Sequence, residues 1–102
     1  MDVYQTIRSA IQDRKQVVAT YQGHVREMCP HVIGYGPTGI AQALFFQFAG
    51  GSSRGLPPGG MWRCLRLADL SDVETRNGEW HTGPRHSQPQ TCVRQVDLEV
   101  DY

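Results

Sequence analysis

The stretch QVVATYQGHVREMCP, residues 16–30, decides the fold of this chain. From Val17 to Tyr21 every second side chain falls on the same face, which is the period of a β-strand. Gly23-His24 can turn the chain, and the residues that follow continue as a partner strand. Pro30 lacks a backbone donor, so it indicates an edge, a bulge or the end of that strand. The stretch therefore predicts a β-hairpin.

Two further stretches also have the character of strands. WRCLRLADL, residues 62–70, places two arginines among apolar residues. IAQALFFQFA, residues 40–49, is short, rich in Phe and bounded by glycine, as buried strands are. Residues 50–60 between them are mainly Gly, Pro and Ser and predict a loop. Apolar residues alternate with acids over 95–101, the pattern of a half-exposed strand.

The N-terminal residues 2–14 predict a helix, because their apolar side chains recur at the spacing of one helix face. We expect this helix to cover one opening or edge of the sheet. The side chains on that face belong to Val3, Ile7, Ala10 and Ile11.

These elements predict a mainly β (α+β) fold, with one helix followed by about five antiparallel strands in a small closed or nearly closed β-barrel. With 102 residues, the chain is large enough for one core and too small for two. We therefore expect one domain. Its parts are the helix at 2–14, the barrel core at 16–75, a polar loop extension at 76–95 and the last strand at 95–101.

Charge gives a mixed indication of partners. Ten basic and ten acidic residues cancel, so no strong overall field recruits nucleic acid or an anionic membrane. Nine of the ten bases are Arg, whose forked donors suit carboxylate or phosphate, although a GC-rich coding bias explains the same preference. Acids gather in Asp97, Glu99 and Asp101, so an anion-binding face is expected elsewhere.

The cysteines suggest where the protein resides. Cys29, Cys64 and Cys92 are odd in number and widely spaced, which argues against a disulfide framework and favours a reduced, cytoplasmic setting. The N-terminal MDVYQTIRSA has no apolar segment of the signal-peptide kind. No apolar run approaches the roughly 20 residues that span a bilayer, so no membrane partner is expected.

The histidine and cysteine spacings do not suit a metal site, because no Cys-x-x-Cys and no His-x3-His pair occurs. Cys92 and His86 could form a nucleophile pair, but nothing in the sequence places an orienting acid or an oxyanion donor beside them. We therefore expect no catalytic residue, no metal and no cofactor, and a protein that is not an enzyme.

The order of these features resembles the WYL domain family over residues 5–75. The Tyr-x4-Arg-x3-Pro spacing on the predicted hairpin, followed later by Trp-Arg-x-x-Arg, carries the resemblance. The matching positions are Val18, Tyr21, Arg26, Pro30, residues 44–48, Arg63, Arg66 and Leu70.

The WYL resemblance implies an Sm-like or SH3-like barrel that senses a ligand, often nucleic acid or a nucleotide. The Trp-Tyr-Leu triplet that names the family is absent, and Ala43, Leu44 and Phe45 stand near its place. Family members usually follow a helix-turn-helix in bacterial regulators, and these 102 residues have no room for one. The resemblance thus implies a sensor or regulatory module without its own DNA-binding domain.

Arg26, Arg63 and Arg66 are the first candidates for a ligand site. If the second and fourth strands approach each other, their guanidiniums can bind phosphate through short, charge-assisted hydrogen bonds. Arg63 and Arg66 are three residues apart and face opposite sides of a regular strand, so only one joins Arg26 unless a bulge intervenes. The competing interpretation is ion pairing at the barrel rim. Its acidic partners would be Asp69, Asp72 or Glu27.

Aromatic side chains are candidates for stacking on bases. Tyr21 and Trp62 are favoured because they are amphipathic and near arginines, whereas Phe46 and Phe48 are expected in the core. The Gly-rich loop could present backbone amides, Ser52, Ser53 and Arg54 to an anion, or be a flexible connection.

The polar segment WHTGPRHSQPQT, residues 80–91, either wraps the barrel and lines the site or is a mobile loop. We hypothesise that His81 and Arg85 contribute to a binding surface. The predicted ligand-binding set is Tyr21, Arg26, His31, Arg54, Trp62, Arg63, Arg66 and His81.

The sequence favours a non-enzymatic module that binds an anionic ligand, such as a nucleotide or single-stranded nucleic acid, against Arg26 and Arg63. The alternative is a protein-interaction module, in which a barrel edge or the acidic last strand pairs with a second copy or with a partner protein. Salt separates the two, because phosphate contacts weaken steeply with added salt.

Overall fold

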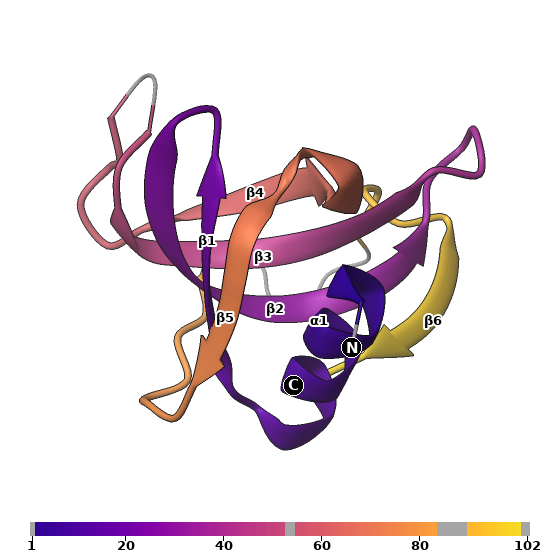
Figure 1. Ribbon diagram of the computed structural model, residues 1–102, viewed down its shortest axis with the longest axis horizontal. Coiled ribbons are helices and arrows are strands. Elements are labelled where there is room, and N and C mark those ends of the chain that lie inside the picture. The colour runs from indigo at the N-terminus through magenta and orange to yellow at the C-terminus, as the bar shows by residue number, and fades with distance from the viewer. Residues whose placement is uncertain (1, 53–54, 84–89, 101–102) are drawn as a thin grey trace.

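The computed structural model describes residues 2–52, 55–83 and 90–100. Within these ranges, one N-terminal helix precedes six antiparallel strands in one sheet (Figure 1). The mainly β prediction is confirmed. The elements are α1 (Val3–Asp13), β1 (Gln16–Tyr21), β2 (His24–Tyr35), β3 (Ala41–Gly50), β4 (Met61–Arg66), the 3-10 helix η1 (Leu67–Asp69), β5 (Ser71–Arg76) and β6 (Gln95–Glu99).

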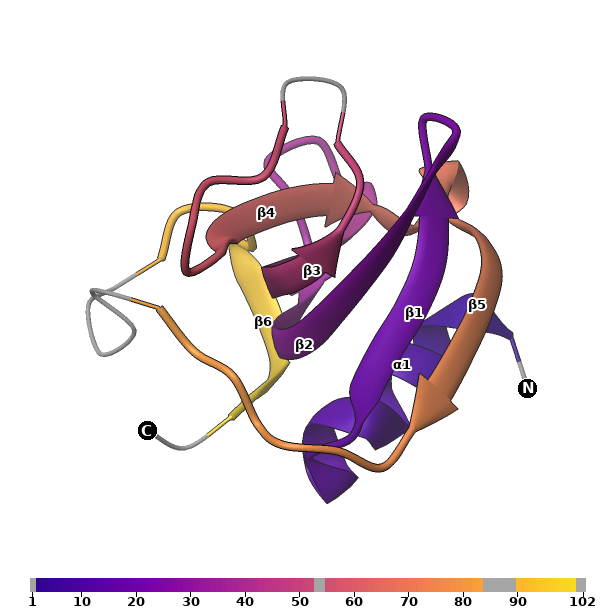
Figure 2. The same cartoon turned by 90° about the vertical axis from the view of Figure 1, so that its left-hand side faces the viewer.

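The sheet has the order β4-β3-β2-β1-β5 and is curled (Figure 2). The first four strands pair in sequence order, as their short connections predict. β6 lies beside the second half of β2 and β1 beside its first half. Of the predicted closed or nearly closed barrel, the closed form is not found, because β4 and β5, which end the path, form no ladder with each other among the described residues. After β4, η1 turns the chain so that β5 reaches β1 instead.

The predicted hairpin is β1 and β2, but its turn lies one residue earlier than expected. Gln22 and Gly23 both have positive φ angles, 50° and 77°, and Tyr21 pairs directly with His24. Two positive φ angles in a two-residue loop match the right-handed twist of the flanking strands. Glycine adopts a positive φ angle without strain, whereas Gln22 is strained in that conformation.

β2 runs through Pro30 to Tyr35, so the proline does not end the strand. The register between β2 and β3 shifts between Pro30 and Val32, which places Pro30 at a bulge, one of the predicted alternatives.

Helix α1 packs on the sheet through the apolar face predicted for it. Ile7, Ala10 and Ile11 are buried there. Asp2 caps the N-terminus of the helix, and its side chain accepts a hydrogen bond from the Gln5 amide at 2.8 Å. A link between Asp97 and the helix ties α1 to β6, because Tyr4 Oη donates to Asp97 Oδ2 at 2.7 Å and Arg8 Nε lies 3.1 Å from the same oxygen.

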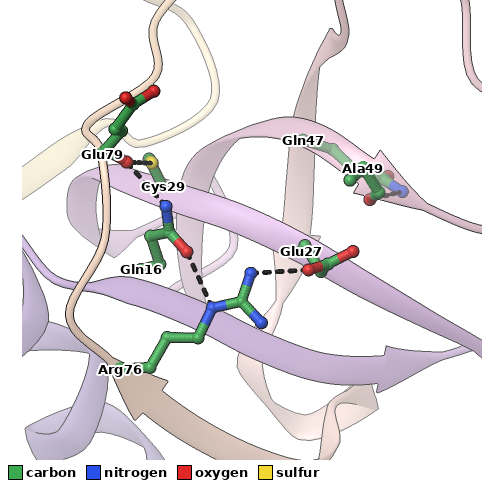
Figure 3. A network of polar contacts seen from close by, with 7 residues as sticks. All are labelled: Gln16, Glu27, Cys29, Gln47, Ala49, Arg76 and Glu79. Carbon is green, nitrogen blue, oxygen red and sulfur yellow. Dashed lines mark hydrogen bonds and ion pairs between the residues drawn. The ribbon is translucent and has the colours of Figure 1, made fainter.

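Within the described residues, no strand follows β5 until β6 begins at Gln95. Gln16 Nε2 donates to the Glu79 carbonyl at 2.7 Å, and Arg76 Nε donates to Gln16 Oε1 at 2.7 Å (Figure 3). Arg76 Nη2 also pairs with Glu27 at 2.6 Å. The bond from Gln16 to the Glu79 carbonyl holds the segment after β5 against the start of β1, and Cys29 Sγ of β2 lies 3.9 Å from the same carbonyl oxygen.

The prediction that the cysteines form no disulfide is wrong for two of them. Cys64 and Cys92 are joined, with their Cα atoms 5.7 Å apart, whereas Cys29 is free and buried. Cys64 lies on the edge strand β4, and the fold brings the segment before β6 beside it across a sequence separation of 28 residues. The disulfide removes the cysteine argument for a cytoplasmic location, which stays a prediction. No helix in the described part of the chain is long and apolar enough to cross a membrane.

Candidate functional site

Arg26 and Arg63 converge on a single acceptor, the side-chain oxygen of Gln47. Arg26 Nη1 donates to Gln47 Oε1 at 3.4 Å, and Arg63 Nε donates to the same atom at 3.1 Å. The three residues come from β2, β4 and the strand between them, β3. The predicted approach of the second and fourth strands therefore takes place across β3.

Hydrogen bonds fix the orientation of the Gln47 amide. Gln47 is fully buried, and its Nε2 donates to the carbonyls of Ala49 and Gly51 at 3.0 and 2.9 Å. Figure 3 shows the first of these bonds within β3. Because an amide nitrogen only donates, these contacts leave Oε1 facing the two guanidiniums. The acceptor is thus in place before any ligand arrives.

Arg26 is an unusual buried cation. Arg26 is 3% exposed to solvent. Its Nε is a buried donor without a hydrogen-bond partner in the described part of the chain. The guanidinium carbon lies 4.8 Å from the centre of the Tyr21 ring, a cation–π arrangement. Burial lowers the pKa of Arg26, and the positive charge of Arg63 lowers it further. The surroundings therefore disfavour the charge that Arg26 carries.

Neither guanidinium has a carboxylate partner among the described residues, whose two ion pairs are Arg8 with Asp97 and Arg76 with Glu27. Glu27, one of the acids expected to compensate the arginines, is thus engaged with Arg76. Two positive groups held near one neutral oxygen form a site with an excess of hydrogen-bond donors and of positive charge, which favours an anion.

A cleft of about 360 Å³ opens at this pair. Arg63 Nη2 donates to Ser52 Oγ at 3.0 Å, which attaches the start of the Gly-rich loop to the cleft wall. Leu65 gives the wall an apolar part. The lining residues are Tyr21, Gln22, Arg26, Ser52, Trp62, Arg63, Cys64 and Leu65.

Arg66 is not brought to the other two arginines. It is exposed and pairs in register with Gln42, whereas Arg63 pairs with Phe45. The alternation along β4 thus separates Arg63 from Arg66, as the three-residue spacing predicts. No bulge interrupts the ladder between β3 and β4.

His31 and His81 also lie outside the cleft, in an aromatic cluster. His31 Nε2 lies 3.2 Å from the His81 carbonyl, and its ring centre lies 4.8 Å from that of Trp62 and 5.0 Å from that of Trp80. The His81 amide donates to Cys29 Sγ at 3.2 Å. Trp80 and His81 therefore pack against His31 and Cys29 of β2. None of the described residues of the polar segment lines the cleft.

Trp62 connects the cluster with the cleft. It lines the cleft and packs edge-on against Phe46, with ring centres 5.2 Å apart. Phe48 stacks on His81 at 4.0 Å. Phe46 is buried as expected, but Phe48 is only half-buried. Arg54, Ser53 and Arg85, which the sequence singles out, lie outside the described residues.

Two observations concern metal binding and thiol chemistry. Within residues 2–52, 55–83 and 90–100, no three His, Cys, Asp or Glu side chains gather as a metal would require. Burial raises the pKa of the Cys29 thiol, which disfavours the reactive thiolate.

Gln47 is the site residue that sequence reasoning missed, although the sequence carries its signal. Within FFQFA it is a lone polar residue, two positions from the buried Phe45 and thus on the same strand face. A polar side chain in such a place needs hydrogen-bond partners, and those partners are the arginines and two backbone carbonyls.

Comparisons with protein-family models, with curated proteins and with solved structures found no match to this chain.

Proposed function

We propose that this protein is a non-enzymatic binding module whose cleft takes an anionic ligand, such as a nucleotide or single-stranded nucleic acid, against Arg26 and Arg63. The observation that carries the proposal is the shared acceptor, because two guanidiniums bond to one neutral oxygen without a neighbouring acid among the described residues. A bound anion would supply the missing negative charge and accept the unused N–H groups.

The WYL resemblance supports the same proposal from a different direction. In that resemblance, Arg26 matches the second-strand arginine, and Arg63 and Arg66 match the arginines of the fourth strand. Of these, Arg26 and Arg63 share one acceptor. We propose that the chain is a WYL-like sensor or regulatory module whose ligand is held at this point.

Isothermal titration calorimetry with adenosine monophosphate tests the proposal, with Arg63→Gln as the site variant. Arg66→Gln is the matched control, since it removes the same charge from the same strand on the opposite face. We expect binding to weaken with added salt and to be lost in Arg63→Gln, but to persist in Arg66→Gln. Equal loss in both variants, or no binding to the wild type, would refute the proposal.

A second candidate function is self-association or protein binding through a sheet edge. β4 pairs only with β3, and β5 only with β1, among the described strands, so each has one open edge. Exposed Met61, on β4, adds apolar surface there. Open edges are sites of strand addition. Light scattering over a range of protein concentrations tests this candidate. A dimer that persists in high salt supports it, and a monomer at every concentration excludes self-association.

A further inference from the structure

We infer that the cleft selects a terminal phosphate, the dianion of a phosphomonoester, over the phosphodiester backbone of a nucleic-acid chain. This inference rests on the proposed anion site and specifies its ligand class. It follows from the number of charges in the cleft, the location of other cationic side chains and the packing of the two aromatic rings.

The charge of the cleft matches a dianion. Arg26 and Arg63 are the only charged residues in its described lining, which contains no acid. A phosphomonoester carries up to two negative charges, because its second pKa is about 6, and has three terminal oxygens that accept hydrogen bonds. A phosphodiester carries one charge and has two such oxygens. The monoester therefore compensates both guanidiniums, and the diester leaves one positive charge uncompensated.

In the described part of the chain, the cleft lining holds no cationic side chain beyond these two arginines. Arg8 and Arg76 are engaged with Asp97 and Glu27. Arg14 lies over Trp80, with its guanidinium carbon 5.7 Å from the ring centre. Proteins that hold single strands without sequence preference follow the backbone with a positively charged groove. The described lining offers two arginines at one point, which suits the end of a ligand.

The aromatic rings of the cleft are already engaged. The Arg26 guanidinium lies over the Tyr21 ring, and Trp62 packs edge-on against Phe46 and His31. A base that stacks on Tyr21 from the same side would have to displace a buried guanidinium from an arrangement that partly compensates its charge. Recognition therefore falls on the phosphate, and the base contributes little.

The test compares two hexathymidylates that differ only in a 5′-phosphate or a 5′-hydroxyl group, with adenosine monophosphate as a mononucleotide that carries the same terminal group. From the strength of charge-assisted hydrogen bonds, we expect the 5′-phosphorylated strand to bind about tenfold or more tightly than the hydroxyl strand at pH 7.5. Adenosine monophosphate should bind with similar affinity to the phosphorylated strand. At pH 5.5 the preference should shrink, since most of the monoester is then a monoanion.

Two variants locate the effect. Gln47→Glu retains both arginines and the shape of the side chain but adds a carboxylate, so it should remove the preference for the 5′-phosphate. Arg66→Gln should keep that preference. Circular dichroism verifies that each variant is folded.

Different results would contradict the anion site and its selectivity for a terminal phosphate. If both strands bind equally and Gln47→Glu abolishes both, the site binds anions without selecting a terminal phosphate, and the present inference is wrong. If the hexathymidylate binds more than a hundredfold more tightly than adenosine monophosphate, a chain is recognised and the inference is again wrong. If no phosphate compound binds, the proposed function itself fails.

Discussion

Arg26 and Arg63 lie on strands that do not pair with each other, yet both donate to one oxygen of Gln47 on the strand between them. The amide nitrogen of Gln47 is held by two backbone carbonyls, so the oxygen faces the guanidiniums without a ligand. A neutral acceptor leaves the pair positively charged, whereas a carboxylate in its place would neutralise part of that charge. The proposed anion site therefore depends on Gln, and not Glu, at this position.

The first prediction follows from that dependence. Gln47→Glu should lower the affinity for phosphate about tenfold or more, because its carboxylate compensates part of the charge of the two guanidiniums. The carboxylate also replaces the amide nitrogen that donates to the carbonyls of Ala49 and Gly51, so we expect the free energy of unfolding to fall. Phosphate titration and urea unfolding measure the two effects. Gln42→Glu, on the same strand, serves as the control, because Gln42 lies outside the described lining of the cleft and its replacement should leave the phosphate affinity largely unchanged. Retained phosphate affinity in a folded Gln47→Glu variant would count against the charge argument.

The second prediction concerns loss of the acceptor. Gln47→Leu removes the acceptor of Arg26 Nη1 and Arg63 Nε. It also removes the donor to the carbonyls of Ala49 and Gly51. We expect a loss of about 1–3 kcal/mol in the free energy of unfolding. Urea unfolding measures it, and a neutral effect would show that water replaces the lost contacts.

The third prediction is a pH dependence that comes from Asp97. The hydrogen bond from Tyr4 lowers the pKa of Asp97 below its usual 3.8, and Arg8 lowers it further. A carboxyl with a lowered pKa in the folded state stabilises the protein above its unfolded pKa, and this contribution is lost as the pH falls through the folded pKa. Wild type should therefore exceed Asp97→Asn in stability at neutral pH, and the difference should vanish in acid. Tyr4→Phe should show an intermediate dependence in urea unfolding between pH 2 and 7. Equal pH slopes for wild type and Asp97→Asn would contradict the assignment.

The fourth prediction concerns the disulfide between Cys64 and Cys92. Protein purified without reductant, then denatured and alkylated, should carry one alkyl group, on Cys29, and three after reduction. From the loop length, opening the disulfide should cost about 3–4 kcal/mol of stability, measured by urea unfolding with and without a phosphine reductant. Three alkyl groups on the unreduced protein would show that the bond does not form.

Local patterns predict those parts of the fold that depend on neighbouring residues. Period-two alternation from Val17 onward indicates the hairpin, and the apolar stripe of Ile7, Ala10 and Ile11 indicates the docked helix. The three-residue spacing of Arg63 and Arg66 correctly separates them onto opposite faces. Each of these features is a property of one strand or helix, so alternation or helical periodicity alone carries it.

Features that depend on distant parts of the chain could not be predicted in this way. The pairing of Cys64 with Cys92 depends on where the segment before β6 lies, which no local pattern determines. The open sheet depends on η1 and on β5 reaching β1. The turn at Gln22 requires a positive φ at a residue that rarely adopts one. His31 and His81 contact each other because the 79–83 segment lies along β2, and the polar sequence of that segment does not specify such a course.

The most direct measurement of the central claim is a crystal soaked in tungstate, a tetrahedral dianion whose anomalous scattering locates it without ambiguity. We predict a peak within hydrogen-bond distance of the Arg26 and Arg63 guanidiniums in the wild type and its absence in Gln47→Glu. A wild-type cleft without a peak, while tungstate occupies other arginines such as Arg66, would contradict the account.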